Sequence, residues 1–129
     1  MSQITDRARL LLNQHHTYRR GCSGFVTSVY QIPYRTANSL MGPNPEMVGV
    51  KGHYKNIVPG NVVGWKTPNG HGHVGIYIGK QKGRSQFIDV HSENEKPRIV
   101  HSYGNHPLYK SSYSFPRKVQ IFSRRKKPP

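Results

Sequence analysis

The segment Gly21-Cys22-Ser23-Gly24-Phe25-Val26 decides how this chain folds, because it joins a polar, basic run to an amphipathic stretch. Apolar residues recur at helical spacing from Phe25 onward and Pro33 ends the pattern, which predicts a helix from about residue 22 to 31. Cys22, the only cysteine of the chain, then lies in the first helical turn. Unpaired backbone N–H groups and the helix dipole at that position favour thiolate over thiol.

A second helical pattern precedes this segment. Apolar residues at helical spacing predict a first helix from about residue 4 to 14. The chain from Pro33 to Asn56 is rich in Pro, Gly, Asn and Tyr, which favours an irregular connection with one short helix near residues 36–41.

The rest of the chain has the pattern of short strands separated by Gly, Asn, Lys and Pro clusters. Helices that precede a run of strands favour an α+β fold, with the N-terminal helices packed on an antiparallel sheet of about five strands. The length of 129 residues fits a single domain over residues 1–129, with a flexible tail from about residue 124 to 129. The predicted strands are 61–65, 73–78, 86–91, 98–102 and 118–122.

The charge balance is strongly basic. Twenty Lys and Arg residues against five acids give a formal charge of +15, which attracts polyanions such as nucleic acid, anionic lipid or an acidic cell-wall polymer. One cysteine excludes an internal disulfide, so stability has to come from packing. No apolar run approaches the ~20 residues of a membrane span, and the N-terminus has no pattern of a secretion signal.

A nucleophilic thiol requires a base, a third group that fixes the imidazole tautomer, and donors for the oxyanion. His73 enters an apolar strand, and side-chain alternation places it on the same face as Tyr77, from which it can point toward the helix of Cys22. Asp89 in mid-strand needs a partner, and a histidine ring N–H is a suitable one. His91, two residues further on the same face, is the alternative third residue or a substrate contact.

Several further residues can complete such a site. The backbone N–H of Cys22 can stabilise the oxyanion, and we expect Arg20, Ser23 and His71 to contact the substrate. His71 and His73 could instead bind zinc together with Cys22, but the paired-cysteine spacing of zinc sites is absent. The sequence therefore predicts neither a metal nor another cofactor.

Two motifs carry a resemblance to a known family. Residues 21–26 and the strand 72–79, Gly-His-Val-Gly-Ile-Tyr-Ile-Gly, resemble the NlpC-type papain-like cell-wall peptidases, and residues 59–65 are similar to that family's turn and strand before the histidine. The resemblance implies a papain-like fold with Cys22 as nucleophile and His73 as base. Asp89 follows Phe87-Ile88 at the third catalytic position, which is often histidine in that family. Gly21 and Asn61 replace two of the family's usual polar residues.

The short length, the basicity and residues 6–26 together resemble the type VI secretion amidase effectors, most nearly their second subfamily. That resemblance implies an antibacterial toxin that hydrolyses peptidoglycan stem peptides, with the bond between diaminopimelate and D-alanine as the expected target. It also implies a cognate immunity protein and the type VI secretion apparatus as partners. The chain would be made in the cytoplasm without a signal peptide and delivered to the periplasm of target bacteria.

Two hypotheses from other classes remain open. A nucleic-acid-binding module would use Arg19, Arg20 and the basic tail, although no known binding motif is present and no nucleic-acid partner is expected. A papain-like acyltransferase would use the same cysteine and histidine but transfer the acyl group to an amine or a lipid. Detection of a transferred product in place of a hydrolysed one would distinguish the acyltransferase from the peptidase.

Overall fold

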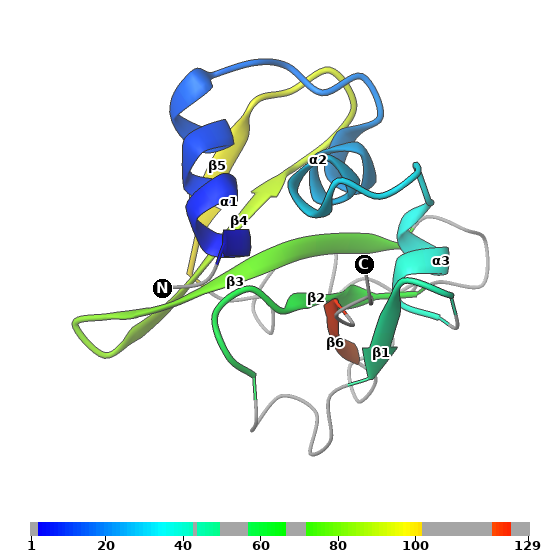
Figure 1. The fold of residues 1–129 in the computed structure, drawn as a ribbon. Helices are drawn as coiled ribbons and strands as arrows, with labels where there is room; N and C mark the ends of the chain where they lie inside the picture. The colour runs from blue at the N-terminus through cyan, green and yellow to red at the C-terminus, as the bar shows by residue number, and fades with distance from the viewer. Residues whose placement is uncertain (1–2, 43, 50–56, 67–71, 102–119, 125–129) are drawn as a thin grey trace.

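The computed structural model describes residues 3–42, 44–49, 57–66, 72–101 and 120–124 (Figure 1). Three helices come first, two where helical spacing predicted them and a short one within the predicted irregular connection. They are α1 (Gln3–Gln14), α2 (Gly21–Tyr30) and α3 (Ala37–Leu40). The strands are β1 (Met47–Gly49), β2 (Val62–Trp65), β3 (His73–Gln81), β4 (Arg84–Val90), β5 (Pro97–Val100) and β6 (Gln120–Arg124).

The α+β class, with N-terminal helices on an antiparallel sheet, is confirmed, but the count of about five strands is wrong. Within the described ranges the sheet has six strands in the order β1-β6-β2-β3-β4-β5. Four of them, β2 to β5, form a consecutive antiparallel ladder, and β6 pairs with both β2 and β1. The missed strand is β1, which lies in the Pro- and Gly-rich connection and is only three residues long.

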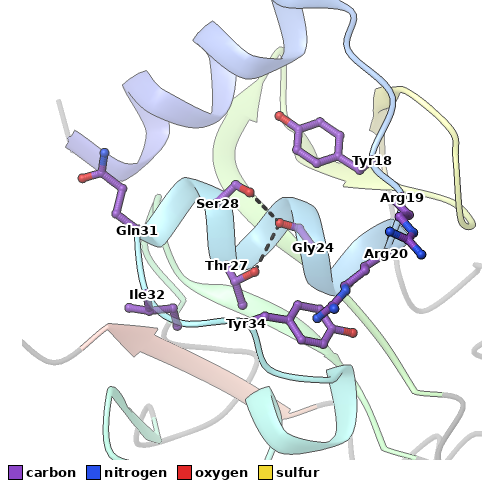
Figure 2. Close-up of a pocket in the computed structure, with 9 residues that line it drawn as sticks. All are labelled: Tyr18, Arg19, Arg20, Gly24, Thr27, Ser28, Gln31, Ile32 and Tyr34. Atoms are coloured by element: carbon purple, nitrogen blue, oxygen red, sulfur yellow. Dashed lines mark hydrogen bonds between the residues drawn. The ribbon is translucent and has the colours of Figure 1, made fainter.

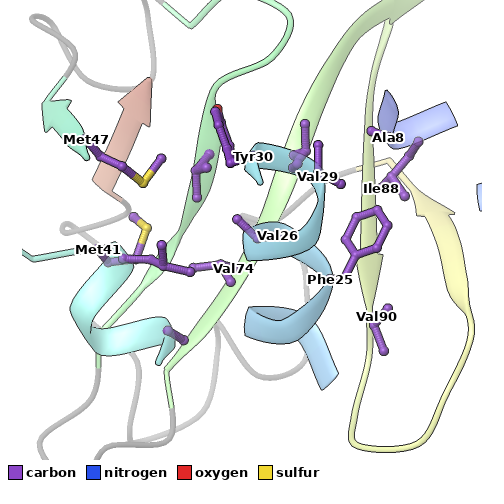
Figure 3. Packing of buried hydrophobic residues seen from close by; sticks show 14 of the residues in the cluster. Ala8, Phe25, Val26, Val29, Tyr30, Met41, Met47, Val74, Ile88 and Val90 are labelled. Atoms are coloured by element: carbon purple, nitrogen blue, oxygen red, sulfur yellow. The ribbon is translucent and has the colours of Figure 1, made fainter. Parts of the chain in front are cut away.

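The helices and one face of the sheet enclose the main core. Helix α2 packs on β3 and β4, and α1 packs beside it on the same side of the sheet (Figures 1 and 3). Alternate residues of β3 face this layer, so Val74 and Ile76 are fully buried against Val26 and Val29 of α2. Burial of each such side chain stabilises the fold by roughly 1.5–3 kcal/mol, which fixes α2 against the sheet.

A smaller core lies on the opposite face of the sheet. It contains Val63 and Trp65 of β2, Tyr77 of β3 and Phe87 of β4, all at most 5% exposed. Because both faces are covered, β2 is buried at every position and has no polar face.

Strand β6 ends at Arg124, and residues 125–129 of the predicted flexible tail lie outside the described ranges. Among the described residues, no helix has the length and apolar character needed to cross a bilayer.

Candidate catalytic site

The N-terminus of α2 is held against the chain that follows β4. Gly21, the first residue of α2, is buried and has a φ of +64°, a left-handed conformation that glycine adopts without strain. A Cβ at this position would lie 3.2 Å from both the carbonyl carbon of Ser92 and the nitrogen of Glu93. Glycine at position 21 therefore permits a close approach and brings Cys22 to the end of β4.

Cys22 is half-buried, and its thiol is hydrogen-bonded to the imidazole of His73. The sulfur also accepts a hydrogen bond from the backbone N–H of Val74. Burial raises the pKa of the Cys22 thiol, but the hydrogen bond and charge of His73 and the Val74 N–H outweigh it, so the pKa lies below its ordinary value. These contacts therefore favour the thiolate form of Cys22.

His73 is the first residue of β3 and is 1% exposed. Alternation places it on the face of Tyr77, which lies in the core opposite the helices, and its ring packs on Trp65 with ring centroids 5.1 Å apart. The contact with Cys22 forms because His73 lies at the end of the strand, next to the N-terminus of α2. The predicted contact is present, but alternation along β3 does not explain it.

The strand beside β3 approaches the histidine closely. Gly64 of β2 pairs with Val74, and a Cβ at Gly64 would lie 1.9 Å from the carbonyl oxygen of His73. Only a residue without a side chain leaves room for the His73 backbone here, so Gly64 helps to fix the position of the ring.

Asp89 of β4 is completely buried, and its Oδ2 lies 2.8 Å from Nε2 of His73. Since Nε2 faces Asp89, the ring nitrogen that faces the Cys22 sulfur is Nδ1. Burial disfavours the imidazolium, but the hydrogen bonds to Asp89 and Cys22 raise the pKa of His73 to about 9. Burial also acts against the carboxylate, yet the hydrogen bonds and charges of His73 and Arg98 lower the pKa of Asp89 to about 2.

Arg98 of β5 is a member of this cluster that the sequence reasoning missed. Its Nε donates to Oδ1 of Asp89 at 2.9 Å, and its Nη2 donates to Nδ1 of His91 at 3.1 Å. The signal that could have found it is the antiparallel register, which places Asp89 opposite Arg98 across the β4–β5 ladder. His91 therefore contacts Arg98, and the third position beside His73 is occupied by Asp89.

A pocket of about 440 Å³ opens over the face of α2 that points away from the sheet (Figure 2). At its end nearest Cys22, the guanidinium of Arg20 lies 4.2 Å from the ring centroid of Tyr34. The Tyr34 hydroxyl is hydrogen-bonded to that of Ser23 at 3.0 Å. Within the described part of the chain no carboxylate lines the pocket, and neither Arg19 nor Arg20 forms an ion pair.

His71, the remaining expected substrate contact, lies outside the described residues. The hypothesis of a zinc site that includes His71 therefore also concerns a residue outside the described ranges. Among the residues that are described, no group of three or more His, Cys, Asp or Glu side chains is arranged to hold a metal ion.

No protein-family model matches the chain, and a search of curated proteins finds no match either. The case for function therefore depends on the geometry of these residues.

Proposed function

We propose that this protein is a cysteine peptidase that hydrolyses stem peptides of bacterial peptidoglycan. One observation carries the proposal. The thiol of Cys22, at the N-terminus of a helix, is hydrogen-bonded to His73, whose other ring nitrogen lies 2.8 Å from the buried carboxylate of Asp89. A nucleophile, a base and an orienting acid in this order form the constellation of acyl-transfer enzymes.

In the first half of the reaction, the Cys22 thiolate attacks the carbonyl carbon of an amide, and the C=O electron pair moves onto oxygen. The backbone N–H of Cys22, in the first turn of α2, has no acceptor within the helix and is available to the oxyanion. When the tetrahedral intermediate collapses, the His73 imidazolium gives its proton to the departing amine. The acyl group then remains on sulfur as a thioester.

In the second half, His73 is neutral and takes a proton from water as the water oxygen attacks the thioester carbonyl. The carbon–sulfur bond breaks, the acid leaves, and the thiolate–imidazolium pair is restored. The carboxylate of Asp89 holds the ring in one orientation through both halves, because its hydrogen bond at Nε2 keeps Nδ1 directed at the sulfur.

The charge of the protein supports an anionic substrate. Stem peptides carry free carboxylates, and a formal charge of +15 concentrates the enzyme on an anionic wall. Arg20 lies two residues before the nucleophile, and the stacking of its guanidinium on Tyr34 holds a cation beside the site. Bidentate guanidinium–carboxylate pairing is the contact that such a residue makes best.

The finer assignment extends this proposal. By the resemblance of residues 6–26, the bond is that between diaminopimelate and D-alanine, and the protein is an antibacterial effector that a type VI apparatus delivers to the periplasm. A cognate immunity protein in the producing cell then covers the surface beside Cys22.

The test is digestion of purified sacculi with the wild type and with Cys22→Ala, followed by separation of the muropeptides and mass analysis of the new termini. Loss of cross-linked dimers with the wild type alone is the expected result, and the termini identify the bond. Arg84→Ala, a change at an exposed position at the far end of β4, is the matched control and retains activity. If sacculi stay intact with the wild type as well as with Cys22→Ala, and both proteins are folded, the proposal is ruled out. A product joined to an added amine instead of water indicates an acyltransferase.

A further inference from the structure

Asp89 contacts two different side chains, one at each carboxylate oxygen. Nε2 of His73, on β3, lies 2.8 Å from Oδ2, and Nε of Arg98, on β5, lies 2.9 Å from Oδ1. We propose that Arg98 is a positioning residue, which orients the Asp89 carboxylate toward His73 and thereby sets the ionisation of the Cys22 thiol. This inference rests on the proposed use of Cys22 as nucleophile, and it does not depend on the identity of the substrate.

The placement of Arg98 follows from the sheet. Asp89 and Arg98 are directly opposite residues of the β4–β5 ladder, so their side chains leave the sheet on the same face. Asp89 is completely buried, whereas the Arg98 side chain is 40% exposed. A fully exposed ion pair contributes little to stability. Here Asp89 is shielded from water, so its attraction to Arg98 is screened less.

His91 fixes the second arm of the guanidinium. An arginine has no acceptor atom, so the 3.1 Å contact between Arg98 Nη2 and His91 Nδ1 requires that Nδ1 accept the hydrogen bond. The guanidinium therefore bridges Asp89 and His91, two residues that lie on the same side of the strand. Lysine has a single ammonium group and lacks the planar fork needed to span both partners in this way.

The effect on sulfur passes through two residues. Arg98 and His73 both favour the charged form of Asp89, and the charged carboxylate favours the imidazolium of His73. The imidazolium in turn favours the thiolate of Cys22. The Asp89 pKa of about 2 is far below the range in which a thiol titrates, so Arg98 acts through the orientation of the carboxylate and not through its charge state. Without the contact at Oδ1 the carboxylate can rotate away from Nε2 of His73, which weakens the support for the imidazolium and should make the thiol harder to ionise.

The experiment measures the rate of Cys22 alkylation by iodoacetamide against pH, which reports the thiolate without any peptide substrate. In Arg98→Met the midpoint should move upward by about one pH unit, equal to about a tenfold lower rate at pH values below the midpoint. Arg98→Lys should give an intermediate midpoint, because it keeps the charge and loses the fork. Arg84→Met, which removes an exposed arginine at the far end of β4, is the matched control and leaves the midpoint in place.

A double-mutant cycle separates action through Asp89 from a general effect of charge. In an Asp89→Asn background, the further change Arg98→Met should move the midpoint by less than a third of its effect in the wild type. An additive shift in that background overturns the proposal. So does Arg98→Met with lowered thermal stability but an unmoved midpoint. If Arg98→Met does not fold, the midpoint of Arg98→Lys decides in the same way. If the wild type leaves sacculi intact but the alkylation midpoints shift as expected here, the role of Arg98 stands and only the proposed function is contradicted.

Discussion

The imidazole of His73 and the carboxylate of Asp89 lie 2.8 Å apart, and their side chains are at most 2% exposed. A buried pair at this distance fixes the rotation of the His73 ring and keeps a proton on Nε2, the nitrogen that faces Asp89. The nitrogen left for catalysis is Nδ1, on the side of the Cys22 sulfur. This relationship separates Asp89 from His91 as the third member of the site, because His91 contacts Arg98 instead.

The first prediction concerns the choice between these two residues. Asp89→Asn keeps the shape of the side chain but removes its charge, so we expect peptide hydrolysis to fall by roughly 10²- to 10⁴-fold. His91→Ala removes only one partner of Arg98, and we expect a loss of less than about tenfold. Steady-state rates on a soluble cross-linked muropeptide measure both effects.

Circular dichroism of both variants provides the control for folding. A larger loss for His91→Ala than for Asp89→Asn, with both proteins folded, would reverse the assignment and make His91 the orienting residue.

The second prediction concerns the pH dependence of the reaction. Hydrolysis requires the thiolate of Cys22 and the imidazolium of His73 at once, and these forms coexist between the lowered pKa of Cys22 and the pKa of His73, about 9. The rate should therefore rise as the thiol loses its proton and fall as pH passes through about 9, where His73 loses the proton needed by the leaving amine. The two limbs belong to the coupled pair.

Alkylation of the thiol provides the matched measurement, because it needs the thiolate alone. Its rate should reach a plateau and show no alkaline fall. In His73→Ala, burial acts on the thiol without the opposing imidazolium, so the midpoint of alkylation should rise above the ordinary pKa of cysteine. A midpoint that stays where it is in the wild type would show that His73 does not ionise Cys22.

The third prediction concerns the backbone before the nucleophile. Gly21 and Gly83 both have positive φ, +64° and +77°, but a Cβ would press on the chain after β4 at Gly21 and would meet nothing within 4 Å at Gly83. Gly83→Ala should lower the free energy of unfolding by about 1–2 kcal/mol through backbone strain alone. Gly21→Ala should cost more and should also lower kcat, because Cys22 moves with the turn.

Denaturant titration and steady-state kinetics of the two variants test this comparison. Equal losses of stability, with kcat unchanged in Gly21→Ala, would mean that the close approach to Ser92 and Glu93 has no part in placing the thiol.

Much of the helical layer, and the roles of Cys22 and Asp89 in the site, could be predicted from local sequence. The helical spacing and Pro33 gave α2 nearly to the residue, and a lone cysteine in its first turn indicated a nucleophile. Asp89 could be predicted because an acid within an apolar strand needs a partner, and a histidine on a neighbouring strand can supply it.

The rest depends on long-range pairing that a single sequence does not specify. The short strand Met47–Gly49 forms because β6 lies beside it, more than seventy residues later in the chain. Arg98 looks like an ordinary surface arginine until the β4–β5 register places it opposite Asp89. The contact of His73 with Cys22 arises at the end of β3, where the packing of α2, and not strand alternation, decides which groups meet.

The last prediction concerns recognition of the substrate beside the thiol. The guanidinium of Arg20 stacks on Tyr34 and has no ion pair among the described residues, so it can bind a carboxylate of the peptide. Arg20→Ala should raise KM by about tenfold, the effect of about 1.4 kcal/mol, with kcat within about twofold. Arg84→Ala removes the same charge away from the site and controls for general attraction. The difference should vanish on a substrate whose carboxylates are amidated. Equal KM values for the two variants, or a difference that survives amidation, would exclude Arg20 as the carboxylate contact.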